Sequence, residues 1–119
     1  MSKIRASTQF INVMVKVKAG TTAGTYDVHT APKVPLVTQC DTVINYQLYD
    51  DDNQGIYFTG LDVTPIGNNQ LSPASLSISR KQLTLTDANT ESITLNVNLL
   101  FSDGKSTFSH DPQIRNEPD

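Results

Sequence analysis

The sequence of 119 residues contains one cysteine, Cys40, and no tryptophan. A single cysteine cannot form a disulfide within the chain, and Met1–Arg5 lacks the apolar stretch of a secretory signal. These features predict a protein of the reducing cytoplasm. No apolar run approaches the roughly 18 residues that a membrane-spanning helix needs. A chain of this length buries roughly two-thirds of its unfolded surface, so a single domain, 1–119, requires neither a disulfide nor a metal for stability.

Positive charge is also scarce. Nine Lys and Arg residues stand against twelve Asp and Glu residues, which gives a formal net charge of -3. Nucleic-acid binding requires a concentrated positive patch, and this balance argues against it. Lys3, Arg5, Lys16 and Lys18 do gather near the N-terminus. No aromatic residues are interleaved with them, so a solvated strand end is the favoured interpretation.

Alanine and helical periodicity are both sparse. The chain has 14 threonines and 6 alanines, and β-branched side chains favour strands over helices. Apolar residues do not recur at helical spacing in any window. Alternation instead predicts strands, at about 10–18, 42–50, 56–64 and 92–101, with short ones near 76–78 and 83–85. The class is therefore all-β.

The strand spacing predicts two antiparallel sheets packed face to face in an immunoglobulin-like sandwich, with a jelly roll or small barrel as the alternative. Pro32 and Pro35 exclude a central strand between Tyr26 and Cys40. That stretch is expected to form an edge strand or an extended crossover.

The third strand contains a break in its alternation. Ile56 and Phe58 occupy even-numbered positions, whereas Leu61 and Val63 occupy odd-numbered ones, so a regular strand would place the two pairs on opposite faces. One extra residue would return both pairs to a single face, which predicts a β-bulge at Thr59-Gly60.

The dipeptide Asp103-Gly104 predicts a two-residue type I′ hairpin turn. In that register Ser102 pairs with Lys105, Leu99 lies opposite Phe108, and Val97 lies opposite His110. Phe108 then falls on the buried face, and Asp111-Pro112 ends the ladder.

Groups suited to catalysis are few. The chain has two histidines, His29 and His110, in addition to Cys40. A nucleophile needs an adjacent base and a zinc site needs closely spaced ligands, and these positions indicate neither. We therefore expect no enzyme. The enzymatic alternative would join His110, Asp111 and Cys40 or a tyrosine in one pocket.

An acidic turn offers the strongest resemblance to a metal site. Asp50, Asp52 and Gln54, followed by Gly55, resemble the opening of a Ca²⁺-binding loop. Leu61 occupies the position where the bidentate glutamate is expected, and no helix enters the loop. A solvated turn, in which Asp and Asn side chains bond their own backbone, is favoured over a Ca²⁺ site.

The last ten residues, 110–119, are predicted to form a polar tail. A tail with two prolines frays unless its own domain or a second copy of the chain holds it. Ile114 is its only apolar anchor, and Arg115 is its only cation. The predicted interface residues are His110, Asp111, Pro112, Ile114, Arg115, Glu117 and Pro118.

The dipeptides Asp111-Pro112 and Glu117-Pro118 resemble the signature of the DP-EP family of small bacterial proteins. The length and β-rich character of the whole chain are similar to that family as well. The resemblance implies a bacterial β-sandwich of unknown function, with no established catalytic residues.

Two functional hypotheses follow. The leading one is a non-enzymatic module that self-associates, as a homodimer, through the tail or an edge strand. The alternative is a domain that binds a small ligand or a cation at Asp50–Gly55, with Tyr49 and Tyr57 as aromatic walls. Neither nucleic acid nor a membrane is an expected partner.

Overall fold

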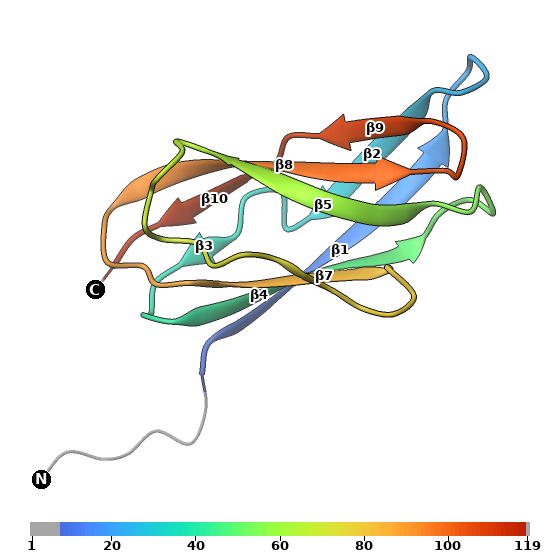
Figure 1. Cartoon of the computed structure of the whole chain (residues 1–119). Coiled ribbons are helices and arrows are strands. Elements are labelled where there is room, and N and C mark those ends of the chain that lie inside the picture. The colour runs from blue at the N-terminus through green and yellow to red at the C-terminus, as the bar shows by residue number, and fades with distance from the viewer. Residues whose placement is uncertain (1–7, 119) are drawn as a thin grey trace, which may run out of the picture.

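The computed structural model describes residues 8–118, which form ten strands and no helix (Figure 1). The strands are β1 (Phe10–Ala19), β2 (Tyr26–Ala31), β3 (Leu36–Val37), β4 (Thr42–Asp50), β5 (Tyr57–Thr64), β6 (Ser75–Leu76), β7 (Gln82–Asp87), β8 (Ile93–Ser102), β9 (Thr107–His110) and β10 (Gln113–Asn116). One sheet has the order β2-β1-β4-β7-β6, and the other has the order β3-β10-β8-β5, with β9 also paired to β8. The two sheets face each other without closing into a barrel, so the predicted sandwich is confirmed.

Each sheet contains one parallel pair, which departs from the predicted purely antiparallel arrangement. β1 pairs with β4 in parallel, and β10 pairs with β3 in parallel. Parallel neighbours require a crossover connection. After the β1–β2 hairpin, the chain crosses to the other sheet to form β3 and then returns as β4 on the opposite side of β1. The crossover accounts for the weak patterning between Tyr26 and Cys40, which supplies an edge strand to each sheet.

The core lies between the inward faces of β1, β4, β7 and β8. The alternating residues predicted to face inward on β1, β4 and β8 are mostly those that the structure buries completely. They include Val13, Val15, Val17, Ile44, Tyr46, Leu95, Val97, Leu99 and Phe101. Burial of each large aliphatic side chain stabilises the fold by about 1.5–3 kcal/mol.

Two local predictions in the sheets have clear outcomes. The register between β5 and β8 shifts between Phe58 and Gly60, which confirms the bulge. The short strand predicted around 76–78 ends earlier, because only Ser75 and Leu76 pair with β7. Ile78 lies in the following turn and is fully exposed.

The predicted register of the last hairpin is wrong by two residues. Ser102 pairs with Thr107 rather than Lys105, and Phe108 lies opposite Phe101 rather than Leu99. The Asp103 carboxylate accepts hydrogen bonds from the backbone N–H groups of Lys105 and Ser106, which fixes a four-residue turn. Of the residues in this turn, only Gly104 has a positive φ, whereas a type I′ turn needs two such residues. A shift of two residues keeps Phe108 on the same face.

The segment predicted as a tail is held by its own domain. β9 places His110 opposite Leu99, and β10 places Gln113 opposite Asn96, so both strands follow one register along β8. Pro112 lies between them and has no N–H, although its carbonyl accepts a hydrogen bond from Val97. β10 then continues the sheet to its last residue, Asn116.

Candidate functional site

β2 forms a regular and open edge of its sheet. It pairs with β1 over all six residues, and the register shows no bulge. Tyr26, Val28 and Thr30 are at least partly buried, whereas Asp27 and His29 are exposed. Within residues 8–118, no backbone hydrogen bond outside the β1–β2 ladder involves β2. Its outward N–H and C=O groups are therefore available to another strand.

The other sheet edges are short or irregular. β3 and β6 have two residues each, and β9 has four. β5 is longer, but its bulge after Phe58 interrupts the ladder. The backbone N–H of Phe58 also donates to Arg80 O, which ties the start of β5 to the β6–β7 turn. β2 is thus the longest uninterrupted edge in the part of the chain that the structure describes.

One end of β2 is fixed to the opposite sheet by aromatic packing. The Tyr26 ring stacks on Phe108 with centroids 4.5 Å apart, and Phe108 stacks on Phe101 at 5.0 Å. The Tyr26 hydroxyl donates to Asp103 Oδ2 at 2.6 Å. These contacts hold the edge strand in a defined position, so its exposed backbone is already ordered.

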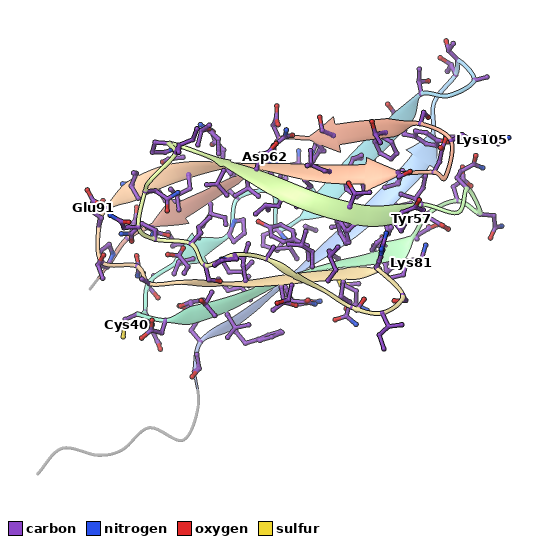
Figure 2. The ribbon with its side chains drawn as sticks, in the orientation of Figure 1. Cys40, Tyr57, Asp62, Lys81, Glu91 and Lys105 are labelled. Carbon is purple, nitrogen blue, oxygen red and sulfur yellow. The ribbon has the colours of Figure 1, made fainter. Side chains whose placement is uncertain are left out.

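A cleft of about 380 Å³ lies between β2 and the β9–β10 junction. β2, Lys33 and Val34 line one side, and residues 110–113 line the other. The structure therefore brings His110, Asp111 and Pro112 together with His29 and Lys33. Cys40 does not line this cleft, and Figure 2 shows it at the corner where β4 begins. The cleft thus joins the predicted residues of 110–112 to the edge strand, without a cysteine.

The two histidines interact through their charges. Burial lowers the pKa of His110, the Asp111 charge raises it, and the charge on His29 lowers it. The pKa of His110 therefore lies below the ordinary value of a histidine. No hydrogen bond to the His110 side chain is present among residues 8–118, so no base or acid partner orients it.

The other residues predicted to form an interface make contacts within their own domain. Ile114 is fully buried in the core. Arg115 donates to Thr94 and Ser92 and forms an ion pair with Glu117 at 3.4 Å. The Glu117 backbone N–H donates to Val37 O, and Pro118 is exposed beyond β10. These residues complete the β10 edge, and none of them lines the cleft.

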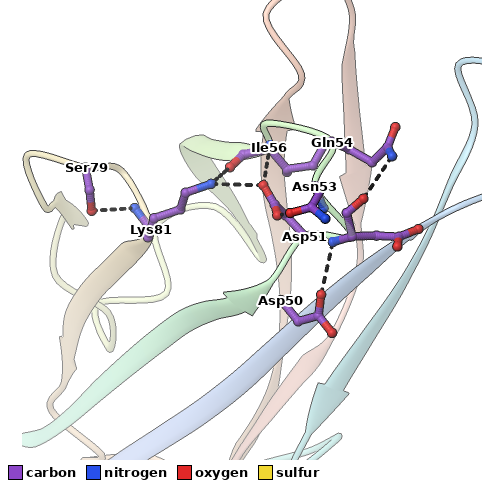
Figure 3. Close-up of polar contacts among 8 residues, drawn as sticks. Asp50, Asp51, Asn53, Gln54, Ile56, Ser79 and Lys81 are labelled. Carbon is purple, nitrogen blue, oxygen red and sulfur yellow. Dashed lines mark hydrogen bonds and ion pairs between the residues drawn. The ribbon is translucent and has the colours of Figure 1, made fainter.

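The acidic turn uses its carboxylates to bond its own backbone (Figure 3). Asp50 Oδ1 accepts from the backbone N–H of Asp52, and the Gln54 amide donates to Asp52 O. Asp52 Oδ2 accepts from the backbone N–H of Ala19. Among residues 8–118, no group of three or more His, Cys, Asp or Glu residues is placed to hold a metal ion.

Asp51 is the carboxylate that organises this turn. It accepts hydrogen bonds from Asn53 and Ile56, and it forms an ion pair with Lys81 at 3.2 Å. The Lys81 ammonium also donates to Ile56 O, at the end of the sandwich where Tyr57 lies (Figure 2). Burial would raise the pKa of Asp51, but the hydrogen bonds from Ile56 and Lys81 outweigh it and lower the pKa. A lysine thus already neutralises the central acid of the turn.

The profile of the DP-EP family matches residues 9–118 of the chain. No curated protein matches it. In the described part of the chain there is no helix of the length and apolar character needed to cross a membrane. The matched range contains both sheets, the cleft and the Asp111-Pro112 and Glu117-Pro118 dipeptides.

Proposed function

The chain belongs to the DP-EP family, and we propose that it is a non-catalytic interaction module that forms a homodimer through the free edge of β2. The observation that supports this most directly is the six-residue, bulge-free edge whose outward backbone groups have no partner in residues 8–118. Such an edge pairs readily with another strand, and proteins usually shorten, bulge or cover it. β2 shows none of these protections.

The sequence of β2 favours an identical strand as its partner. In an antiparallel pair related by a two-fold axis at Val28, Asp27 of one copy lies opposite His29 of the other. The same contact occurs twice, because a two-fold interface repeats every pair. Asp27 and His29 are both exposed on one face of the strand, so each carboxylate can accept a hydrogen bond from an imidazole. Cross-strand pairs of this kind contribute roughly 0.2–1 kcal/mol each.

Apolar residues next to β2 extend the surface that such a dimer would bury. Val34 lies in the connection after β2 and Leu36 begins β3, and these two residues are 46% and 48% exposed. A stable interface buries at least about 1,000 Å² in total, which exceeds what six paired residues provide. The dimer would therefore also cover the Lys33–Leu36 segment beside the cleft.

Light scattering after size exclusion tests the proposal, with the full chain over a range of concentrations. We expect a dimer for the wild-type chain. Asp27→Lys places an ammonium opposite the His29 imidazole of the other copy, and His29→Asp places two carboxylates opposite each other. Each variant is therefore expected to shift the equilibrium to monomer. The double variant places an ammonium opposite a carboxylate and is expected to restore the dimer, which a merely structural effect on folding would not do.

Asp62→Lys is the matched control, because it makes the same charge change on β5, at another edge of the sandwich (Figure 2). It is expected to leave the dimer intact. A wild-type chain that stays monomeric at every attainable concentration contradicts the proposal. So does a dimer that both single variants leave unchanged.

The proposal also places the protein in the reducing cytoplasm of a bacterium. Cys40 is exposed and makes no disulfide. An exposed thiol persists in a reducing compartment and oxidises outside it. Fractionation of the producing cells, with detection of the native protein, tests this placement.

A further inference from the structure

The cleft between β2 and the β9–β10 junction brings four titratable side chains together. His29 and Lys33 lie on the β2 side, and His110 and Asp111 lie on the side of the junction. The charge on His29 acts on the pKa of His110, so the two imidazoles are near enough to interact across the cleft. The volume of about 380 Å³ is within the range of small-molecule sites.

The net charge of the cleft depends on its two imidazoles. Lys33 is positive and Asp111 is negative, so their charges cancel while both imidazoles are neutral. Leu99, which lies opposite His110 on β8, adds no charge. Each imidazole that takes up a proton adds one positive charge. The cleft is therefore neutral at alkaline pH and becomes cationic as the pH falls.

The charges of the neighbouring strand are balanced. Lys16 and Lys18 of β1 lie opposite His29 and Asp27 in the β1–β2 ladder. The Lys16 ammonium is also 3.8 Å from Asp50 Oδ2. An acidic residue thus accompanies each of these two lysines, and the pH-dependent charge of the cleft comes from its own histidines.

The cleft also has an apolar part. Val28, Val34 and Pro112 line it, and Val34 is 46% exposed. Thr30 and Gln113 add a hydroxyl and an amide without charge. Small-molecule sites combine apolar walls with a few polar groups that fix the orientation of the ligand. A ligand that matches both parts has an apolar body and one anionic end.

Other small ligands fit these residues less well. A zinc ion needs several His, Cys, Asp or Glu ligands around it, and no group of three or more is so placed in residues 8–118. The Lys33 ammonium would also repel a cation. Inorganic phosphate would use the positive charges of the cleft but would leave Val28 and Val34 without an apolar partner.

We propose that the cleft binds a small carboxylic acid in its ionised form. The carboxylate lies between the Lys33 ammonium and the imidazoles of His29 and His110, and the apolar body packs against Val28 and Val34. A bound anion favours the protonated imidazoles, so binding takes up protons and strengthens as the pH falls. One chain supplies every lining residue, so the site does not rest on the proposed dimer.

Benzoate is the probe, because it joins a carboxylate to an apolar ring, and benzamide is its neutral isostere. Amide NMR titrations of the full chain at pH 6 and pH 8 measure the Kd. At pH 6 we expect saturable shifts in residues 28–34 and 110–113, with a Kd in the millimolar range. At pH 8 the Kd is expected to be about tenfold higher, because a pKa shift of one unit corresponds to a tenfold change. Benzamide is expected to give no saturable shift.

Four substitutions test the roles of the charged groups. Lys33→Gln is at an exposed position and is expected to fold and to raise the Kd at pH 6 several-fold. His110→Gln removes one titrating group, so the Kd values at pH 6 and pH 8 move closer together. Asp111→Asn removes the opposing charge and is expected to lower the Kd at pH 8. Lys105→Gln, in the β8–β9 turn outside the cleft, is the matched control and keeps the wild-type Kd (Figure 2).

Three results would overturn the site. One is the absence of saturable benzoate shifts in the cleft at pH 6. Another is a Kd that is the same at pH 6 and pH 8, and the third is a wild-type Kd in Lys33→Gln. Light scattering of the same samples reports the oligomeric state, so a failure of the carboxylate site and a failure of the dimer are distinguished.

Discussion

The Tyr26 hydroxyl donates a hydrogen bond of 2.6 Å to Asp103 Oδ2 and so joins the edge strand of one sheet to the β8–β9 turn of the other. The same carboxylate accepts from the backbone N–H groups of Ser106 and Lys105. Together these hydrogen bonds hold the pKa of Asp103 well below its usual range, and the bond from Tyr26 contributes most. The interaction therefore contributes to stability only while Asp103 is ionised.

Tyr26→Phe should reveal this contribution, because it removes the donor and keeps the ring stacked on Phe108. The folded-state pKa of Asp103 lies below the unfolded value of about 4. The stabilisation is therefore fully present above that pH and is lost as the pH falls below it. We expect urea unfolding to show Tyr26→Phe as less stable than wild type at pH 7, with the difference shrinking once the pH falls below the folded-state pKa that Asp103 keeps in the variant. Tyr57→Phe is the control, and a difference for Tyr26→Phe that is constant with pH would contradict this account.

Ile114→Ala tests whether the last strand is part of the core. The side chain is fully buried, so its truncation should lower the free energy of unfolding by about 2–5 kcal/mol. Arg115→Ala, one residue away, removes only partly exposed polar contacts and is expected to cost about 1 kcal/mol or less. Equal, small effects of the two substitutions in chemical denaturation would show that β10 frays.

The three aspartates of the acidic turn should differ in importance. Asp51 accepts from Asn53, Ile56 and Lys81, whereas Asp50 and Asp52 each accept one exposed backbone hydrogen bond. Asp51→Asn is expected to lower stability by about 1 kcal/mol, because Asp51 is partly exposed and its ion pair is screened. Asp50→Asn and Asp52→Asn should each cost less. A larger loss for either of these two in urea unfolding would point to a role outside the turn.

His110 makes the cleft sensitive to pH. Burial lowers its pKa, Asp111 opposes this shift, and His29 adds to it. The unfolded chain therefore binds a proton more readily than the folded chain. The stability linked to His110 is present above the ordinary pKa of about 6.5 and is lost as the pH falls through it.

The corresponding measurement is urea unfolding of wild type and His110→Gln between pH 8 and pH 5. The wild-type chain should lose more stability over this range than the variant. Parallel curves for the two proteins would mean that His110 titrates alike in the folded and unfolded chains.

Much of the sandwich follows from simple alternation. β1, β4 and β8 alternate over nine or ten residues, and each has one face in the core, so the pattern is long and unambiguous. The bulge in β5 could be predicted because its parity changes at a single glycine, Gly60. The hairpin register could not, because the Asp103 side chain bonds two backbone N–H groups that the dipeptide alone does not indicate.

The candidate sites depend on contacts between distant segments. His29 and His110 line one cleft only because the packing of the two sheets places β2 beside the β9–β10 junction, and no local pattern encodes that arrangement. Asp87, Asn89 and Asn116 are residue types that are common in solvated turns. They are buried here because β10 packs against this end of the sandwich. The sequence offered a cation candidate only at the acidic turn, with a solvated turn favoured, because clustered carboxylates are visible in a sequence, whereas a buried polar set assembled from three segments is not.

The position of β10 also has a consequence for synthesis. It lies between β3 and β8, so the second sheet has a gap until residues 113–116 leave the ribosome. Until then β8 lacks its partner over Ile93–Asn96, and the core side chain of Ile114 is missing. A chain that stops before Gln113 has an open edge on β8 and an incomplete core. A chain without residues 113–116 therefore lacks both the neighbour of β8 over Ile93–Asn96 and the buried side chain of Ile114.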